Sequence, residues 1–398
     1  MNDKNMRIAV IGGAGRVGLS LSLSMARNNF EVVAIDIDKA KVEMLKDGKL
    51  PFMEEGGLEL LKQINEEMLS FCTEHNNVAK CDVIILTVGT PVDEHLNPNL
   101  THVYEAIDQI KPFLHDGQVI ILRSTLFPGT SEKIYESLKS AGLNVGVSFC
   151  PERIAQGKAL KEIRDFPQII SGSDPESLDV ARHIFSTIAC EVIELKMTEA
   201  ELAKLYTNAW RYIKFAVSNQ FYMIAVEKGL DFHKIHKAIT SNYPRAKDLP
   251  VAGFAAGPCL FKDTMQLAAY NRQHFPLGHA AMQINESLPN FLIDCVKRNQ
   301  SLKGTFVGIL GMAFKGDSDD NRESLSYKLR KLLQYEGATV MCTDPYIRAG
   351  DFFPLETVLK DCELLFIGCP HSVYRQIDFE GLDVIDCWSF VKGKEEND

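Results

Sequence analysis

A cysteine that precedes a lysine–aspartate pair is the feature of this sequence that points to covalent chemistry. Cys259 follows Gly257 and Pro258 and is followed by Lys262 and Asp263. A thiolate can attack an aldehyde to give a thiohemiacetal, which loses a hydride to give a thioester that water then hydrolyses. These steps need a carboxylate to activate the water and a cation near the developing oxyanion. Asp263 and Lys262 carry these groups, so we predict the oxidation of an alcohol or aldehyde to a carboxylate.

The position of Cys259 in the chain favours a reactive thiol. A helix that begins just after this residue would place it at the helix N-terminus, where the dipole stabilises a thiolate. The alternative is a buried cysteine that acts as a small apolar side chain, and we assign that role to the other nine cysteines. No C-x-x-C spacing occurs, which predicts free thiols in a reducing cytoplasm. His233 and His236 have no cysteine or acid cluster beside them, so no metal site is predicted.

A hydride acceptor is encoded at the N-terminal end of the chain. Residues 7–11 form an apolar run, and Gly13-Ala-Gly15-Arg-Val-Gly18 follows it directly. In this fingerprint the glycines allow a tight turn, a close approach of the pyrophosphate and close helix packing. Asp36 ends the next apolar run, where a carboxylate binds the ribose of NAD and repels the 2′-phosphate of NADP. We therefore predict NAD as the cofactor, bound by Gly13, Gly15, Arg16, Val17, Gly18 and Asp36.

The elements that must position these residues form an α/β protein of two Rossmann-like, doubly wound domains. Short apolar runs typical of buried strands alternate with helical segments, which predicts parallel sheets. Such runs occur at 7–11, 31–36, 82–88, 118–122, 145–149 and 168–171, and again at 305–310, 338–343, 363–368 and 383–387. Between the two groups we expect a helical central domain with one long connecting helix from Thr198, as N-cap with Glu201 in a capping box, to about Lys228. The predicted domains are 1–196, 197–302 and 303–398.

Composition narrows the range of partners. The chain has 53 acidic and 43 basic residues, a net charge of −10, and a surface of this sign disfavours nucleic acid and anionic membranes. No apolar stretch is long enough to span a bilayer. We therefore expect a small-molecule substrate, with no nucleic acid and no membrane as partner.

Several further motifs, taken with Cys259, resemble the UDP-glucose/GDP-mannose dehydrogenase family of nucleotide-sugar 6-dehydrogenases over essentially the whole chain. They stand in the family's order: the fingerprint with Asp36, Pro51–Leu58, Val88-Gly-Thr90-Pro91, Ser124-Thr125 with Pro128-Gly129-Thr130, Pro151-Glu152-Arg153, Glu201-x-x-Lys204-x-x-x-Asn208, Cys259 with Lys262-Asp263-Thr264, Gly311–Lys315, and Asp319–Ser324. The resemblance implies two successive NAD-dependent oxidations at C6 of a UDP-sugar. The product would be a UDP-uronic acid for polysaccharide or glycoconjugate synthesis.

The resemblance also implies roles for individual residues. Cys259 would be the nucleophile, and Lys204 and Asn208, on one helix face, would bind the C6 oxygen. Asp263 and Thr125 would hold the catalytic water, and Glu152 would act as acid or base. The remaining implied contacts are Thr90, Pro91, Thr125 and Arg322 to the cofactor, and Glu152, Lys204, Asn208, Gly257, Cys259 and Lys315 to the substrate.

Structural roles remain open for three of these residues. Lys204 could be a solvated helix lysine, Glu152 a loop cap, and Arg322 the ion-pair partner of Asp319 or Asp320.

The sugar is predicted less sharply than the reaction. Lys262-Asp263-Thr264 resembles the UDP-glucose enzymes, whereas Pro151-Glu152-Arg153 resembles the N-acetylhexosamine enzymes, and we favour the latter. Pro258 stands where the family often has glycine. Proline stiffens the turn and removes a backbone donor, so we expect a glycine-dependent contact to the sugar to be lost or replaced.

Two functions remain as alternatives to the UDP-sugar enzymes: a one-step β-hydroxyacid dehydrogenase, which needs neither Cys259 nor the C-terminal domain, and a non-catalytic NAD- or nucleotide-sugar-binding protein. The long helix and the family precedent predict a homodimer.

Overall fold

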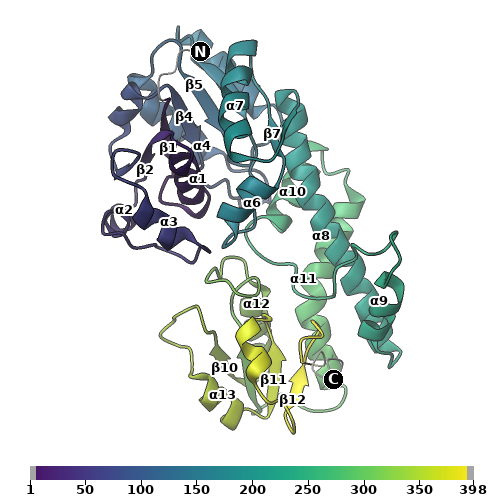
Figure 1. Cartoon of the computed structure of the whole chain (residues 1–398). Coiled ribbons are helices and arrows are strands. Elements are labelled where there is room, and N and C mark those ends of the chain that lie inside the picture. Colours follow the sequence, from purple (N-terminus) through teal and green to yellow (C-terminus); the bar gives the residue numbers. More distant parts are fainter. Residues whose placement is uncertain (1–5, 392–398) are drawn as a thin grey trace. The chain divides into compact units, whose positions relative to one another are not determined.

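The computed structural model describes residues 6–391, and its contacts divide the chain into two compact units, Met1–Thr207 and Asn208–Asp398. Figure 1 shows the elements of both units along the chain. Helix α8 (Met197–Glu227) begins in the first unit and continues into the second. Each unit is described below by itself.

A six-stranded parallel sheet forms the centre of the first unit. Its strands are β1 (Arg7–Ile11), β2 (Glu31–Ile35), β3 (Leu69–Cys72), β4 (Val83–Leu86), β5 (Val119–Leu122) and β6 (Gly146–Phe149). They lie in the order β3-β2-β1-β4-β5-β6, which is the order of a dinucleotide-binding Rossmann sheet. In such a sheet ligands bind beyond the carboxyl ends of the strands, where the order reverses between β1 and β4.

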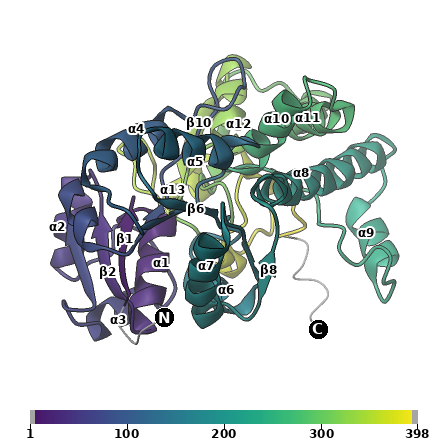
Figure 2. The same ribbon diagram turned by 90° about the horizontal axis from the view of Figure 1, so that it is seen from above.

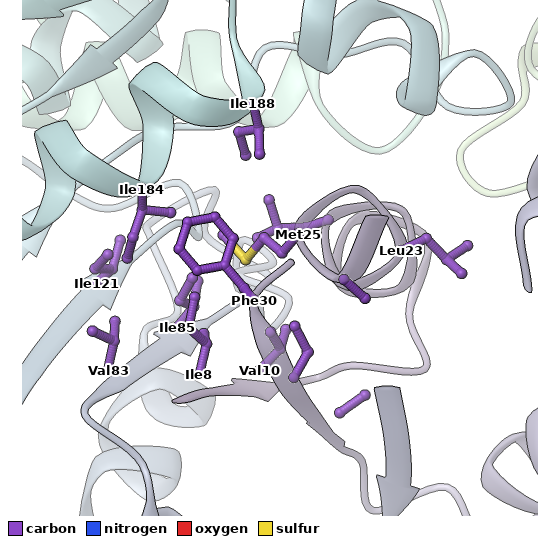
Figure 3. Close-up of a cluster of buried hydrophobic side chains, with 14 of the residues drawn as sticks. Ile8, Val10, Leu23, Met25, Phe30, Val83, Ile85, Ile121, Ile184 and Ile188 are labelled. Atoms are coloured by element: carbon purple, nitrogen blue, oxygen red, sulfur yellow. The ribbon is translucent and has the colours of Figure 1, made fainter. Parts of the chain in front are cut away.

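Helices cover both faces of this sheet because its strands are apolar on both sides. Ile8, Val10, Ile85 and Ile121 face α1 (Arg16–Arg27) and α7 (Pro175–Ile188), whereas their alternate neighbours face α4 (Thr101–Ile110) and α5 (Thr130–Ser140). Figure 2 shows the two helix layers on opposite sides of the strands, and Figure 3 shows Met25 and Ile184 packed over the first face. The remaining helical segments of the unit are α2 (Lys39–Lys46), α3 (Gly57–Gln63), α6 (Ala159–Asp165), and the 3-10 turns η1 (His75–Lys80) and η2 (Lys111–Phe113).

The prediction of a strand near 168–171 is correct, but the strand does not extend the main sheet. Strand β7 (Gln168–Ile170) pairs in parallel with β8 (Val192–Glu194) to form a separate two-stranded sheet. Strands β3 and β8 were not predicted, because each is short and only one residue of the two strands is buried.

The start of the long helix differs from the prediction. Helix α8 begins at Met197, so Thr198 lies inside its first turn and donates to Glu132 Oε1 at 2.9 Å. Glu201 does not close a capping box. Its buried carboxylate instead accepts from Gly129 N (2.6 Å), Ser131 N (2.9 Å) and Ser131 Oγ (2.6 Å), at the N-terminus of α5. Burial raises the pKa of Glu201, and these hydrogen bonds oppose that rise.

The second unit contains a smaller Rossmann-like sheet and a group of helices. Its strands β9 (Phe306–Leu310), β10 (Thr339–Thr343), β11 (Leu364–Ile367) and β12 (Asp383–Ile385) are all parallel, in the order β10-β9-β11-β12. The helical segments are α9 (Phe232–Thr240), α10 (Leu260–Tyr270), α11 (Pro276–Lys297), α12 (Leu325–Tyr335), α13 (Leu355–Asp361) and the 3-10 turn η3 (Ser372–Gln376). The α/β fold with two Rossmann-like sheets and a long connecting helix is therefore confirmed, while the domain limits 1–196, 197–302 and 303–398 stay a prediction.

Replacing Glu201 by alanine should destabilise the first unit by about 2 kcal/mol, because two backbone donors and one hydroxyl lose a buried ionic acceptor. The desolvation of the carboxylate, which the raised pKa reports, keeps the loss below the full sum of three charged hydrogen bonds. Urea denaturation followed by far-UV circular dichroism would measure the change. Glu199→Ala is the control, since exposed Glu199 accepts one bond from Lys196 N on the same helix. An equal loss in both variants would contradict the role of Glu201.

Candidate active site

The glycine-rich turn after β1 is built as a nucleotide-binding turn. Gly12, which has a φ of +79°, and Gly13 both donate to Ile35 O, at 2.9 and 3.0 Å. A Cβ on Gly13 would lie 2.7 Å from Ala34 Cβ, and one on Gly18 would lie 2.2 Å from Gly12 O. These two glycines are required by packing within the unit.

Gly15, in contrast, is not required by packing against other residues of the unit. A Cβ on Gly15 would approach only Gly12 O, at 3.2 Å, among the described atoms. Gly15 is also the N-cap of α1, and no side chain of the described residues caps that helix. An open cradle in front of an uncapped helix N-terminus suits a pyrophosphate, so the residues present fit NAD.

Asp36 closes the turn from the end of β2. Its carboxylate accepts from Ala14 N and from Asp38 N, both at 3.0 Å, and the side chain is half-buried. Arg16 lies with its guanidinium carbon 4.9 Å from the centre of the Phe52 ring, in the predicted Pro51–Leu58 loop. Val17 is half-buried in the first turn of α1. All the residues of the predicted fingerprint are thus brought together at the carboxyl end of β1 and β2.

The loops after β4 and β5 lie at the same edge of the sheet. Ser124 Oγ donates to Val88 O at 2.7 Å and joins the two loops. Thr90 is buried, Pro91 is exposed and Thr125 is half-buried. Since β4 and β5 pair in register, the structure brings Thr90 and Thr125 to adjacent strand ends.

Glu152 follows β6 and is held by partners within its own unit. One carboxylate oxygen bonds to Arg123 Nη2, and the other accepts from Arg153 N (2.7 Å) and Ile154 N (2.9 Å). Arg123 is buried and also donates to Cys150 O (3.1 Å) and Gln168 Oε1 (3.0 Å). The loop cap that the sequence left open is present, and Arg123 is a residue that sequence reasoning missed.

In the second unit, Cys259 occupies the predicted place at the start of a helix. It is the N-cap residue of α10 and is exposed. Asp263 is fully buried one turn later, and its carboxylate accepts from Lys262 Nζ at 2.6 Å and from Asn208 Nδ2 at 2.5 Å. The structure therefore joins Asn208, Asp263 and Cys259.

Lys204 precedes Asn208 by one turn of α8. Its side chain is buried, 8% exposed, rather than the solvated lysine that the sequence left possible. Within residues 6–391 no ion pair or side-chain hydrogen bond of Lys204 is found. An amine at the end of a buried side chain, with no partner among these residues, is a group that a ligand can engage.

The loop between β9 and α12 packs against the cysteine loop. Gly257 has a φ of +97° and donates to Glu323 O at 3.1 Å, and a Cβ on it would lie 2.5 Å from Cδ2 of Phe314. Lys315 lies with its Nζ 5.9 Å from the centre of the Phe314 ring. Arg322 pairs with Asp320, as one of the sequence alternatives stated. The structure thus places Gly257, Lys315 and Arg322 on two touching loops.

Two further features concern metals and membranes. The described residues contain no group of three or more His, Cys, Asp or Glu side chains placed to hold a metal ion. Nor is any helix among them both long and apolar enough to cross a bilayer. None of the ten cysteines forms a disulfide.

The comparisons with known families decide the identity. Three domain descriptions of one family match the chain: the NAD-binding domain at 6–189, the central domain at 198–287 and the UDP-binding domain at 308–391. The chain belongs to the UDP-glucose/GDP-mannose dehydrogenase family. It is therefore an NAD-dependent oxidoreductase that acts on a CH–OH group of a UDP-sugar. A one-step β-hydroxyacid dehydrogenase, which needs no UDP-binding domain, is not supported.

Individual relatives match over nearly the full length. The UDP-N-acetyl-D-mannosamine dehydrogenase of Methanocaldococcus jannaschii is 32% identical, over 99% of this chain and 92% of the relative. The solved UDP-D-ManNAc dehydrogenase of Pyrococcus horikoshii is 26% identical, with a TM-score of 0.88 over 94% of this chain and 92% of its own. The UDP-glucose dehydrogenase of Pyrobaculum islandicum has a TM-score of 0.90 over 98% and 96%, and at 24% identity it shows the shared fold alone.

The two kinds of glycine in the turn of this dehydrogenase should respond differently to alanine. Gly15→Ala should fold like the wild type and weaken NAD binding about tenfold or more, because the new methyl group projects only into the open cradle. Gly18→Ala should lower the thermal midpoint as well, because its Cβ meets Gly12 O. Isothermal titration with NAD and thermal denaturation separate the two effects. Unchanged NAD affinity in Gly15→Ala would contradict the assignment of the cradle.

Proposed function

We propose that the substrate is a UDP-N-acetylhexosamine, with UDP-N-acetylmannosamine as the first candidate. The support is the Pro151-Glu152-Arg153 sequence together with relatives named as UDP-N-acetyl-D-mannosamine dehydrogenases. UDP-glucose is the second candidate, because Lys262-Asp263-Thr264 resembles the enzymes for that sugar. The observation that carries the reaction itself is the exposed Cys259 at the N-terminus of α10, one turn before a buried, doubly bonded Asp263.

The proposed reaction is a four-electron oxidation in two stages. In the first, the C6 alcohol loses a proton and a hydride and becomes an aldehyde. The Cys259 thiolate then adds to the aldehyde carbon, and the thiohemiacetal loses a second hydride to become a thioester. Water attacks the thioester, the bond to sulfur breaks, and the carboxylate and the thiol are released. NAD, when bound, accepts one hydride in each stage, so two NAD and one water are consumed per sugar.

The predicted side chains have the following parts in this scheme. Lys204, whose side chain is buried, and Asn208 hold the C6 oxygen as it gains negative charge. Asp263 orients Asn208 and Lys262 through its two hydrogen bonds, and the hydroxyl of Thr125 holds the hydrolytic water. Glu152 is fixed by Arg123 and by two loop amides, and these contacts favour a hydrogen-bond acceptor over a proton shuttle.

We also propose a homodimer in the cytoplasm. Trp210, Val217, Phe221 and Ile224 lie at spacings of seven, four and three residues on α8, on one helix face, and are 38% to 56% exposed. An exposed apolar stripe of this kind suits a helix that packs against a second copy.

The first test is NADH formation from UDP-N-acetylmannosamine, UDP-N-acetylglucosamine, UDP-glucose and GDP-mannose. We expect one sugar to dominate and about two NADH per sugar consumed. One NADH per sugar would contradict the thioester stage, and no turnover on any sugar would contradict the proposed substrate class.

Cys259→Ser should stall after the first oxidation with a bound aldehyde or a slowly hydrolysed ester, while full wild-type turnover in that variant would exclude the thioester.

The dimer has its own test. Phe221→Glu places a charge in the middle of the α8 stripe and should convert the protein to a monomer in sedimentation velocity. Tyr335→Glu is the control, since Tyr335 is exposed on α12 outside the stripe. A dimer that persists in Phe221→Glu would contradict this interface.

A further inference from the structure

The loop that carries Cys259 is fastened to the loop between β9 and α12. The backbone N–H of Gly257 donates to Glu323 O at 3.1 Å, and the Phe314 ring lies where a side chain on Gly257 would stand. Gly257 precedes Cys259 by two residues, and Glu323 follows Arg322 directly. The cysteine and the arginine are therefore carried by two segments of the same unit that touch.

The guanidinium of Arg322 is held in one orientation by a buried acid. Its Nε lies 3.0 and 3.2 Å from the two carboxylate oxygens of Asp320, and its Nη2 lies 2.7 Å from Oδ2. The backbone N–H of Arg322 also donates to Asp320 Oδ1 at 3.1 Å. The Asp320 side chain is only 3% exposed, whereas that of Arg322 is 54% exposed. A planar guanidinium forked onto a fixed carboxylate loses most of its freedom.

Asp320 is itself fixed by the loop. Its backbone N–H donates to Ser318 Oγ at 3.2 Å, and its carbonyl accepts from Phe314 N at 3.0 Å. Because the Phe314 ring is also the contact of Gly257, one short segment positions both the acid and the cysteine loop.

The charges of Arg322 and Cys259 act on each other. The pKa of Arg322 is raised first by its hydrogen bonds to Asp320 and then by the negative charge of Asp320 and of Cys259, against the effect of burial. Interaction between two charges is mutual, so a guanidinium that gains from an ionised Cys259 also favours that ionised form.

We propose that Arg322 is the counter-ion of the Cys259 thiolate in the free enzyme, and that Asp320 is the positioning residue that sets it there. The proposal rests on the proposed role of Cys259 as nucleophile. It adds a second contribution to that of the helix N-terminus, from a residue that the family resemblance assigned to the cofactor.

The other charged groups near Cys259 suit this role less well. Lys262 on α10 is paired with buried Asp263 at 2.6 Å, so the two charges largely cancel. The charged residues on the helix that Cys259 caps and on the fastened loop include Lys262 and Asp263 in the first turn of α10 and Lys315, Asp317, Asp319, Asp320, Arg322 and Glu323 between β9 and α12. Of these, Arg322 is a cation whose pKa is raised in part by the charge of Cys259, and a guanidinium keeps its charge at every working pH.

The test is the pH profile of Cys259 alkylation by iodoacetamide, without cofactor or sugar, followed on the Cys259 peptide by mass spectrometry. Arg322→Gln should raise the midpoint of the profile by about one pH unit, because the thiolate loses its counter-ion. Arg322→Lys should give a smaller rise, since it keeps the charge and loses the fork. A midpoint in Arg322→Gln equal to that of the wild type would overturn the proposal.

Asp320→Asn gives the sharper result. Removal of a negative charge should by itself lower the midpoint, whereas loss of the Arg322 orientation should raise it. A rise therefore supports the positioning role, and a fall would overturn it. The double variant Arg322→Gln, Asp320→Asn leaves no buried charge unpaired, so it should fold even where Arg322→Gln alone does not. Its midpoint should still rise, but by less than in Arg322→Gln, because the negative charge of Asp320 is removed as well.

Arg330→Gln is the matched control. Arg330 forms a 2.7 Å ion pair with Asp351 in the same unit, and its pKa is raised by groups that do not include Cys259. Its alkylation profile should coincide with that of the wild type. Because no sugar is present, a failure to oxidise any UDP-sugar and a failure of this proposal give separate results.

Discussion

The buried carboxylate of Asp263 is the constraint on which the catalytic half of the molecule depends. A carboxylate with no exposed surface must be paired, since an unpaired charge in that position costs several kcal/mol. Asn208 of α8 and Lys262 of α10 supply the two partners, and Asp263 N donates to Cys259 O at 2.9 Å in the first turn of α10. The contacts around the buried Asp263 therefore fix the side chains of Asn208 and Lys262 and the backbone of Cys259 together.

In the first unit, hydrogen bonds of polar side chains fix the positions of loops rather than of helices. Each loop at the carboxyl edge of the sheet is held by a polar side chain with a defined partner: Thr87 Oγ1 donates to Ile11 O at 2.8 Å, Ser124 to Val88, Arg123 to Glu152, and Glu54 accepts from Gly157 N and Leu160 N, both at 3.1 Å. Loops fixed in this way hold their functional atoms as rigidly as a strand would. These bonds hold the loops at four strand ends in fixed positions within the unit.

The sequence alone predicted whatever depends on local pattern. The apolar strands, the glycine turn and the helix start at Cys259 follow from periodicity and residue type. Strands β3 and β8 were not predicted because three-quarters or more of each is not buried. The strand pattern at 168–171 did not predict the pairing of β7 with β8, because such a pattern does not specify a partner strand. Arg123 with Glu152, and Glu201 with Ser131, were missed because their partners lie 29 and 70 residues away. Thr198 and Glu201 matched a capping box locally, but the α5 N-terminus competed for the carboxylate.

Each Rossmann-like unit has an aspartate after the second strand of its sheet: Asp36 after β2 and Asp344 after β10. Only Asp36 keeps a carboxylate that a ribose could reach. Asp36 accepts two backbone N–H groups and stays half-buried. The Asp344 side chain has no exposed surface and accepts from Met312, Ala313, Tyr346 and Ile347 N–H groups and from His371 Nε2.

Burial alone would raise the pKa of Asp344, but the His371 bond and the backbone donors lower it. His371 Nδ1 accepts from Asp317 N, so its proton is on Nε2. Since its oxygens are engaged internally, Asp344 supports the loop that carries Asp320 and Arg322. Both sheets place their first strand inside, beside the second, and this arrangement belongs to an NAD-binding domain in one unit and to a UDP-binding domain in the other.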